Sequence, residues 1–292
     1  MVRLLMVDGR FKLVPIFAGG GTRLTAHVGV IKALEELDVQ MDHLVATSGG
    51  SIVAALYAAG FSTERLKELA FNADFKRFRG FSMFELLRRG GLCSGVAFET
   101  WLDGLLEGQT FAQLPRELHI VATDVRYGQP VVFDKVATPD IKISRAVRFS
   151  MGVPLVFTFQ EYHGHLLVDG SILSEDALHR DWAGDGTPVY CFRMRNNKDK
   201  PSEPLPLRPW WLLADYANML IQTFLLTLSR EFVNAQYWHR TVVIDTGNLS
   251  PLSFSLSEEQ KAYLYRQGYE TTLTFLPRKM GLESSARHAH AS

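Results

Sequence analysis

Three short stretches of the sequence combine small residues with groups that can bind charge or react. The first is the glycine-rich run Gly19-Gly20-Gly21-Thr22-Arg23, which follows an apolar segment and precedes a helical pattern. Glycines let the backbone approach a ligand closely, and the amides at a helix start favour an anion. Taken alone, the run fits a nucleotide phosphate, the oxyanion of an acyl-transfer reaction, or a tight strand-to-helix turn without a ligand.

This run is a poor match to the known nucleotide-binding motifs. The run lacks the lysine and the following Ser or Thr of a P-loop. A dinucleotide site would place an acidic residue at the end of the second strand, whereas Asp38 precedes that strand. The formal net charge is +0, which gives no basic excess for nucleic acid. Nucleotide binding is therefore a poor fit, and no nucleic-acid partner is expected.

The second stretch, VATSGGS, places Ser48 between an apolar strand and an apolar helix. Ala46 lies two residues before this serine and Gly50 lies two residues after it. This spacing is the G-x-S-x-G pattern of a nucleophile elbow, with alanine in the first small position. Such a sharp turn needs small residues, because larger side chains would collide. The alternative interpretation is a small-residue turn in which the serine caps the helix.

The third stretch, LLVDGS, places Asp169 directly after apolar strand residues and before a glycine. In open α/β sheets the carboxyl ends of strands carry the ligand sites, and burial there favours a carboxylate as a base. A plain Asp-Gly turn is the alternative. A Ser-His-Asp triad would need a histidine, for which His179 and His239 are the only reasonable candidates, each in a context typical of a surface. Ser48 and Asp169 without a histidine would form a dyad.

Hydrophobic periodicity predicts the elements that position these residues. Apolar runs at 12–17 and 43–47 predict buried strands, and the patterns at 26–37 and 51–60 predict helices. This alternation predicts an α/β fold with a largely parallel sheet. The region 62–110 is expected to be mostly helical, and a capping box from Ser257 to Gln260 predicts a last helix that ends near Pro277. Further strands are expected in HIVATDV, PVVFDK, VFTFQEYHGHLLVDGS, TPVYCFRM and TVVIDT.

The bulk composition is that of a globular protein with a sizeable core. Hydrophobic residues make up 47% of the 292 residues, and no run reaches the roughly 18 apolar residues that a membrane span needs. Cys93 and Cys191 lie beside apolar residues and are expected to be buried thiols in a reducing compartment. The start of the sequence does not read as a signal peptide, so a cytoplasmic location is expected. Residues 196–209 are expected to form an exposed, proline-rich loop.

Together these features resemble the patatin-like phospholipase family. GGGTRLTAHVGVIKALEEL is similar to that family's oxyanion loop and first helix, ATSGGS to its serine elbow, and VDGS to its D-G-[GA] motif. The supporting segments GLCSGVAFETWL, VATDVRYGQPVVF and AVRFSMGVPLVF help to extend the resemblance from about Val14 to Leu276. Four residues depart from the family pattern without removing a reacting group: Leu24, Ala46, Gly49 and Ser171.

The resemblance implies a three-layer α/β/α fold with a mostly parallel central sheet. It implies one catalytic domain over residues 1–277, followed by a polar tail at 278–292. The implied activity is that of a lipid acyl hydrolase of phospholipase A or lysophospholipase type, with Ser48 as nucleophile and Asp169 as base. The amides of the loop from Gly19 to Arg23 would bind the oxyanion, and no metal or other cofactor is implied.

Several expectations stay open at the level of sequence. A phospholipid or lysophospholipid is the expected substrate. Two stretches are candidates for membrane contact: 75–89, which interleaves aromatic with basic residues, and the largely apolar 210–233. Each is also typical of a core-packing helix. The alternative functions are a small-ester esterase or acyltransferase with the same dyad, and a catalytically weak lipid-binding protein. Arg23 either orients the glycine loop or meets a lipid phosphate.

Overall fold

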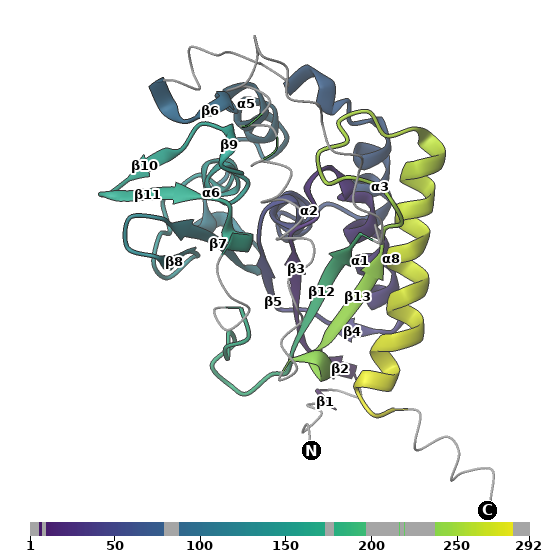
Figure 1. The fold of residues 1–292 in the computed structure, drawn as a ribbon. Helices are drawn as coiled ribbons and strands as arrows, with labels where there is room; N and C mark the ends of the chain where they lie inside the picture. Colours follow the sequence, from purple (N-terminus) through teal and green to yellow (C-terminus); the bar gives the residue numbers. More distant parts are fainter. Residues whose placement is uncertain are drawn as a thin grey trace, which may run out of the picture.

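A central eight-stranded sheet organises the protein. The computed structural model describes residues 6–7, 10–78, 88–172, 178–196 and 237–282, together with positions 216 and 219. The strands follow the order β10-β11-β7-β5-β3-β12-β13, and β8 pairs with β7 (Figure 1). Their bounds are β3 (Val14–Ala18), β5 (His43–Ala46), β7 (Glu117–Asp124), β8 (Gln129–Phe133), β10 (Gln160–Tyr162), β11 (His165–Val168), β12 (Val189–Arg195) and β13 (Thr241–Asp245).

The central strands of this sheet are parallel, and the order in which the chain adds strands reverses at β3. The pairs β7-β5, β5-β3, β3-β12 and β12-β13 are all parallel, whereas β8, β10 and β11 form an antiparallel edge. The chain moves from β3 outward through β5 to β7, and it later returns to the other side of β3 with β12 and β13. A reversal of this kind opens a crevice at the carboxyl ends of the strands, where ligands bind in open α/β sheets.

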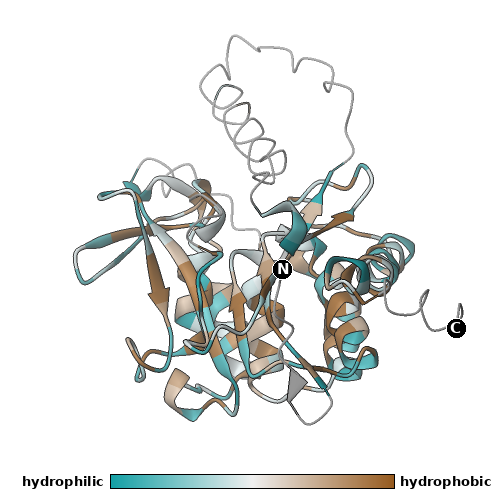
Figure 2. Cartoon of the chain, turned by 90° about the horizontal axis from the view of Figure 1, so that it is seen from below, coloured by the Kyte–Doolittle hydropathy of each residue, from teal (hydrophilic) through white to brown (hydrophobic). Residues whose placement is uncertain are grey.

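The described helices pack on one face of the sheet. They are α1 (Thr25–Glu36), α2 (Gly49–Ala58), α3 (Thr63–Asn72), α5 (Val96–Leu105), α6 (Ile143–Ser150) and α8 (Glu258–Lys279). In each strand alternate residues join the large core beneath these helices, as Phe17 and Phe192 do, because successive side chains of a strand point to opposite faces. Figure 2 shows the hydrophobic colour gathered along the central strands and the helices beside them.

Helices α1 and α8 lie side by side because two glycines let their backbones approach (Figure 1). A Cβ atom at Gly29 would lie 2.1 Å from the carbonyl oxygen of Tyr265. A Cβ atom at Gly268 would lie 2.0 Å from the carbonyl oxygen of Ala26. Helix α8 thereby packs on α1 and completes the hydrophobic core that buries β3 and α1.

The second face of the sheet carries a smaller core. It joins Val14, Ile16, Ala18, Val45, Val121, Val189 and Cys191 to Leu178 and Trp182. Leu178 and Trp182 belong to the segment that precedes β12. In the described part of the chain, this segment covers the second face of the sheet, and no described helix contributes to the cover. The expectation of a second helical layer falls on residues outside the described ranges.

Most of the expected elements are present, and the mostly parallel α/β fold is confirmed. The region 62–110 contains α3 and α5, but the short strand β6 (Gly91–Cys93) interrupts it and pairs with β9 (Leu155–Phe157). A further small sheet joins β1 (Met6–Val7), β2 (Arg10–Lys12) and β4 (Val39–Gln40). Cys93 and Cys191 are both buried, as expected.

The C-terminal helix runs further than its sequence pattern indicates. The capping box at Ser257 and Gln260 is formed, and α8 continues through Pro277 to Lys279, two residues into the expected polar tail. Leu276 and Met280 are buried on the core, and their packing extends the helix beyond the proline.

The two stretches expected to contact a membrane lie largely outside the described part of the chain. Of the stretch 75–89, the structure describes a 3₁₀ turn at Phe75–Phe78 and positions 88 and 89; of the stretch 210–233, it describes positions 216 and 219. Most of the expected loop at 196–209 and the end of the tail are also outside the described ranges. In the described ranges, no helix combines the length and apolar character needed to cross a bilayer.

Candidate active site

The glycine run forms a turn that only glycine adopts easily. Gly19, Gly20 and Gly21 have φ angles of +66°, +107° and +56°, in the left-handed region that disfavours side chains. Two buried side chains hold the carbonyl groups of the turn. His27 Nε2 lies 3.1 Å from the Gly19 oxygen, and Arg23 Nε donates to the Gly20 oxygen at 3.1 Å. These two side chains therefore hold the turn in place.

Three of the five amides in this run already have acceptors. Gly19 N donates to Thr47 Oγ1 at 3.1 Å, Thr22 N to the Pro251 oxygen at 2.9 Å, and Arg23 N to the Gly20 oxygen at 3.1 Å. The amides of Gly20 and Gly21 are not engaged by any residue that the structure describes. The expectation of a five-residue oxyanion site therefore narrows to these two amides, because the other three are occupied.

Arg23 holds the loop in place. Its guanidinium donates to the Gly20 oxygen, to Thr246 Oγ1 at 2.7 Å and to the Leu249 oxygen at 3.3 Å. The residue is 2% exposed, and burial lowers its pKa to about 10. These contacts join the loop to the segment that follows β13, so the structure favours the loop-orienting role over contact with a lipid phosphate.

Ser48 occupies a strained elbow between β5 and α2. Its φ of +50° is unusual for a residue with a side chain, and such strain is common at functional sites. The elbow packs directly on the glycine loop. A Cβ atom at Gly49 would lie 2.3 Å from the Gly21 oxygen, and one at Gly50 would lie 2.2 Å from the Phe17 oxygen. Gly49 is therefore needed here because nothing larger fits against Gly21.

Asp169 follows β11 and lies in the interior at 1% exposure. Its Oδ1 atom accepts a hydrogen bond from Ser171 N at 2.8 Å, and its own amide donates to the Gly152 oxygen at 3.0 Å. Asp169 lies at the carboxyl end of its strand, as the sequence predicts, but this strand belongs to the antiparallel edge of the sheet. Strand β11 is antiparallel to β7 and meets only its end, where Val168 lies opposite Thr123.

Burial makes Asp169 a stronger base than an ordinary aspartate. It raises the pKa to about 6, although hydrogen bonding from Ser48 and Ser171 acts in the opposite direction. The Oδ2 atom has no partner within strict hydrogen-bond geometry among the described residues, and the hydroxyl of Ser48 is near enough to influence the carboxylate. Contacts of this kind are often long before a substrate is bound.

Two pockets meet at Ser48. The first lies at the carboxyl end of β3, beside the reversal of strand order, and it brings together all three glycines of the loop, Ser48, Asp169 and Ser171. The second is apolar and shares Gly21, Ser48, Val153, Pro251 and Leu252 with the first. Its further lining consists mainly of large hydrophobic side chains, namely Ile52, Phe75, Phe78, Phe98, Met151, Phe157 and Phe254.

The two candidate triad histidines lie elsewhere. The ring of His179 stacks on Tyr237 with centroids 4.2 Å apart, and His239 is in an exposed turn at Trp238–Arg240. Within the described residues, no histidine lines the pocket that holds Ser48 and Asp169. His27 lies behind the loop, and burial lowers its pKa to about 4, so its neutral ring donates to the Gly19 oxygen at pH 7.

Sequence reasoning missed the residues that close the site from distant parts of the chain. Pro251 and Leu252 line both pockets, and Ser150 contacts Ser48 through its hydroxyl. The segment AVRFSMGVP was noticed only as a supporting match, and no spacing within it points to Ser48. Among the described residues, no group of three or more His, Cys, Asp or Glu side chains is arranged to hold a metal ion.

Comparisons with known proteins agree with this architecture. A family model described as "Patatin-like phospholipase" matches residues 16–179, which is more than half of the chain. An uncharacterised protein of Acanthamoeba polyphaga mimivirus is 27% identical over 270 residues, covering 87% of this chain and 90% of the relative. An uncharacterised NTE family protein of Mycobacterium tuberculosis is 33% identical over 158 residues, covering 53% of this chain and 41% of the relative.

Two solved structures share the fold at low sequence identity. VipD from Legionella pneumophila has a TM-score of 0.60 and 14% identity, with coverage of 94% of this chain and 70% of VipD. The type III effector ExoU of Pseudomonas aeruginosa has a TM-score of 0.52 and 19% identity, with coverage of 92% and 53%. The fold likeness and the family match lead to the same assignment: this chain belongs to the patatin-like phospholipase family.

Proposed function

We propose that this protein hydrolyses fatty-acyl esters of phospholipids or lysophospholipids through an acyl-enzyme on Ser48. The observation that carries the proposal is the place of Ser48, at the junction of the pocket that holds Asp169 and the loop glycines with an apolar pocket rich in phenylalanine. Membership of the family supports lipid hydrolysis in general.

The proposed reaction begins with proton transfer. A serine hydroxyl is a weak nucleophile until a base takes its proton, and Asp169 is the base beside Ser48. With a pKa of about 6, this carboxylate is largely ionised at neutral pH yet holds a proton better than an exposed aspartate. The Ser48 oxygen attacks the ester carbonyl carbon while Asp169 takes the proton.

The tetrahedral intermediate then needs donors for its negative oxygen. Among the described residues, the amides of Gly20 and Gly21 are the loop donors without an acceptor, and in comparable sites one such donor contributes roughly 2.7–4 kcal/mol to catalysis. Collapse of the intermediate breaks the bond to the alcohol, which leaves with the proton from Asp169. Water, deprotonated by the same carboxylate, attacks the acyl-enzyme, releases the fatty acid and restores Ser48.

The two pockets suggest how a lipid ester would lie. The apolar pocket beside Ser48 suits an acyl chain, because ordinary hydrophobic burial favours its contact with the phenylalanine side chains. The pocket of Asp169 and the loop glycines would take the alcohol portion that departs. This division favours a lipid ester over a small ester, which would leave the apolar pocket largely unfilled.

Active-site labelling tests the proposal directly. A fluorophosphonate should add its mass at Ser48, the Ser48→Ala variant should not be labelled, and Ser62→Ala, a change at the exposed cap of α3, should label normally. Fatty-acid release should be measured on diacyl and lysophospholipids and on short p-nitrophenyl esters. Labelling at another serine, or turnover of short esters alone, would overturn the lipid hydrolase assignment; lipid binding without release would indicate a binding protein.

A further inference from the structure

The turn that ends α6 touches the backbone of both proposed catalytic residues. Ser150, the last residue of the helix, has no exposed surface, and its Oγ atom accepts a hydrogen bond from Ser48 N at 2.9 Å. The same hydroxyl donates to the Val121 oxygen of β7 at 2.6 Å. Two residues further on, the Gly152 oxygen accepts the amide of Asp169 at 3.0 Å.

The Asp-Gly turn is pressed against the same hydroxyl. A Cβ atom at Gly170 would lie 1.9 Å from the Val121 oxygen and 3.2 Å from Ser150 Oγ. One hydroxyl group therefore stands where the serine elbow, β7 and the turn after Asp169 meet. A hydroxyl supplies the donor and the acceptor that this place requires, whereas alanine supplies neither.

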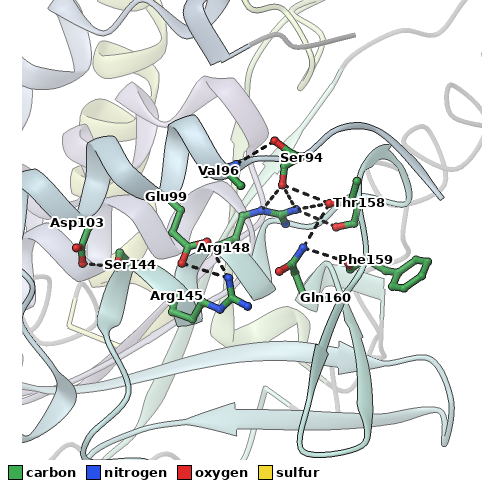
Figure 3. A network of polar contacts seen from close by, with 10 residues as sticks. All are labelled: Ser94, Val96, Glu99, Asp103, Ser144, Arg145, Arg148, Thr158, Phe159 and Gln160. Carbon is green, nitrogen blue, oxygen red and sulfur yellow. Dashed lines mark hydrogen bonds and ion pairs between the residues drawn. The ribbon is translucent and has the colours of Figure 1, made fainter. Parts of the chain in front are cut away.

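The neighbouring part of α6 is firmly anchored on its other side (Figure 3). Arg148 is 1% exposed, and its Nη2 atom donates to the Ser94 oxygen at 2.6 Å and to the Thr158 oxygen at 2.8 Å. Gly95 accommodates this side chain, since a Cβ atom there would lie 2.2 Å from Arg148 Nε. The helix end is thus tied to two loops, and it cannot move freely to follow the elbow.

We infer that Ser150 is a positioning residue, which fixes the Ser48 backbone against the turn that carries Asp169 and so sets the approach of the two side chains. The inference rests on the proposed roles of Ser48 and Asp169. It gives α6 a part in the reaction, although the Ser150 side chain does not line either pocket at Ser48. Through Gly152, the same turn also holds the main chain at Asp169.

A matched pair of variants in α6 tests this role. Ser144 is also a buried serine of α6, 1% exposed, but its hydroxyl donates to Asp103 Oδ1 at 2.7 Å, away from Ser48 (Figure 3). In the full chain, Ser150→Ala should lower kcat on the order of 100-fold, as small misplacements of reacting groups do, with KM changed less than about twofold. Ser144→Ala should leave kcat near the wild-type value.

The pH profile supplies a signature that loss of stability alone would not produce. Hydrogen bonding from Ser48 lowers the pKa of Asp169, so a displaced Ser48 should move the acid limb of kcat/KM to higher pH in Ser150→Ala. The limb should stay in place in Ser144→Ala. If the alanine variant does not fold, Ser150→Cys carries the same test, because a thiol keeps a weak donor and acceptor.

A measurement without turnover separates this inference from the proposed function. In protein labelled with ¹⁵N-serine, the Ser48 amide should exchange its hydrogen faster in Ser150→Ala than in wild type or Ser144→Ala, because it loses its acceptor. Full turnover by Ser48→Ala would overturn the proposed function, whereas the exchange result would still decide whether Ser150 holds Ser48. Equal kcat in the two alanine variants, or unchanged exchange at Ser48, would overturn the positioning role.

Discussion

The buried carboxylate of Asp169 should cost the protein stability that asparagine would recover. The pKa of this group is about 6 in the folded protein, against an ordinary value of 3.8. Because one pKa unit corresponds to about 1.36 kcal/mol, the free energy of unfolding at neutral pH should be about 3 kcal/mol lower than with an unperturbed aspartate. Asp169→Asn should therefore raise stability by about this amount while it abolishes the proposed hydrolysis.

The sign of this effect fixes the pH range in which it appears. Below about pH 4 the carboxyl is protonated in both states, so the wild type and the asparagine variant should be nearly equal. As the pH rises from about 4 to about 6, the unfolded chain loses its proton first, and the wild type becomes progressively less stable. Above the folded pKa of about 6 the penalty is constant.

Urea unfolding of both proteins across this pH range measures the effect. Asp124→Asn is the control of opposite sign: burial would raise the pKa of Asp124, but hydrogen bonds from His165, Arg126 N and Leu166 N outweigh it and hold that pKa below its ordinary value. The Asp124 variant should therefore lose stability at neutral pH. A gain in Asp169→Asn that is the same at about pH 4 and about pH 7 would refute the burial argument.

Three further predictions concern the geometry of the site. The kcat/KM of the wild type should fall on the acid side with a midpoint near the Asp169 pKa of about 6, and a flat profile through that range would exclude this residue as the base. Gly49→Ala should lower kcat/KM by on the order of 100-fold because its Cβ meets the Gly21 backbone at 2.3 Å, whereas Gly104→Ala, with open space around it, should retain activity. Phe75 lines the apolar pocket at Ser48 and a second apolar cavity behind it, so Phe75→Ala should shift preference toward longer acyl chains in a p-nitrophenyl ester series; an unchanged preference would place the acyl chain elsewhere.

The elbow was predictable because its signal is local. Ala46, Gly49 and Gly50 surround Ser48 within a few residues, and the requirement for small side chains at a sharp turn follows from sterics alone. The parallel order of β3 and β5 follows from the helix between them for a similar reason. Asp169 was singled out for its strand-end position, and it does follow β11 directly, but the antiparallel pairing of β11 with β7 was not legible from the sequence.

The sequence could not predict which amides of the loop already donate a hydrogen bond. Five successive residues offer five donors, and nothing in their spacing tells which donors are already bonded. The Gly20 oxygen accepts from Arg23 N within the run, but the other two acceptors are Thr47, at the end of the next strand, and Pro251, which lies more than two hundred residues away in the chain. The contact between Ser150 and Ser48 spans about half of that separation. These contacts depend on how distant segments pack, which hydrophobic periodicity does not encode.

The glycines of the loop are therefore explained by two different requirements, close packing and anion binding. Gly21 has to be small because a Cβ atom there would lie 2.2 Å from the Pro251 oxygen, and Gly49 has to be small because it lies against Gly21 in turn. These close contacts would exist whether or not an anion binds. A glycine-rich run is thus weak evidence for an oxyanion site by itself. The stronger evidence is the combination of two amides without an acceptor in the described part of the chain, at Gly20 and Gly21, with a buried carboxylate beside the elbow serine, because packing alone requires neither.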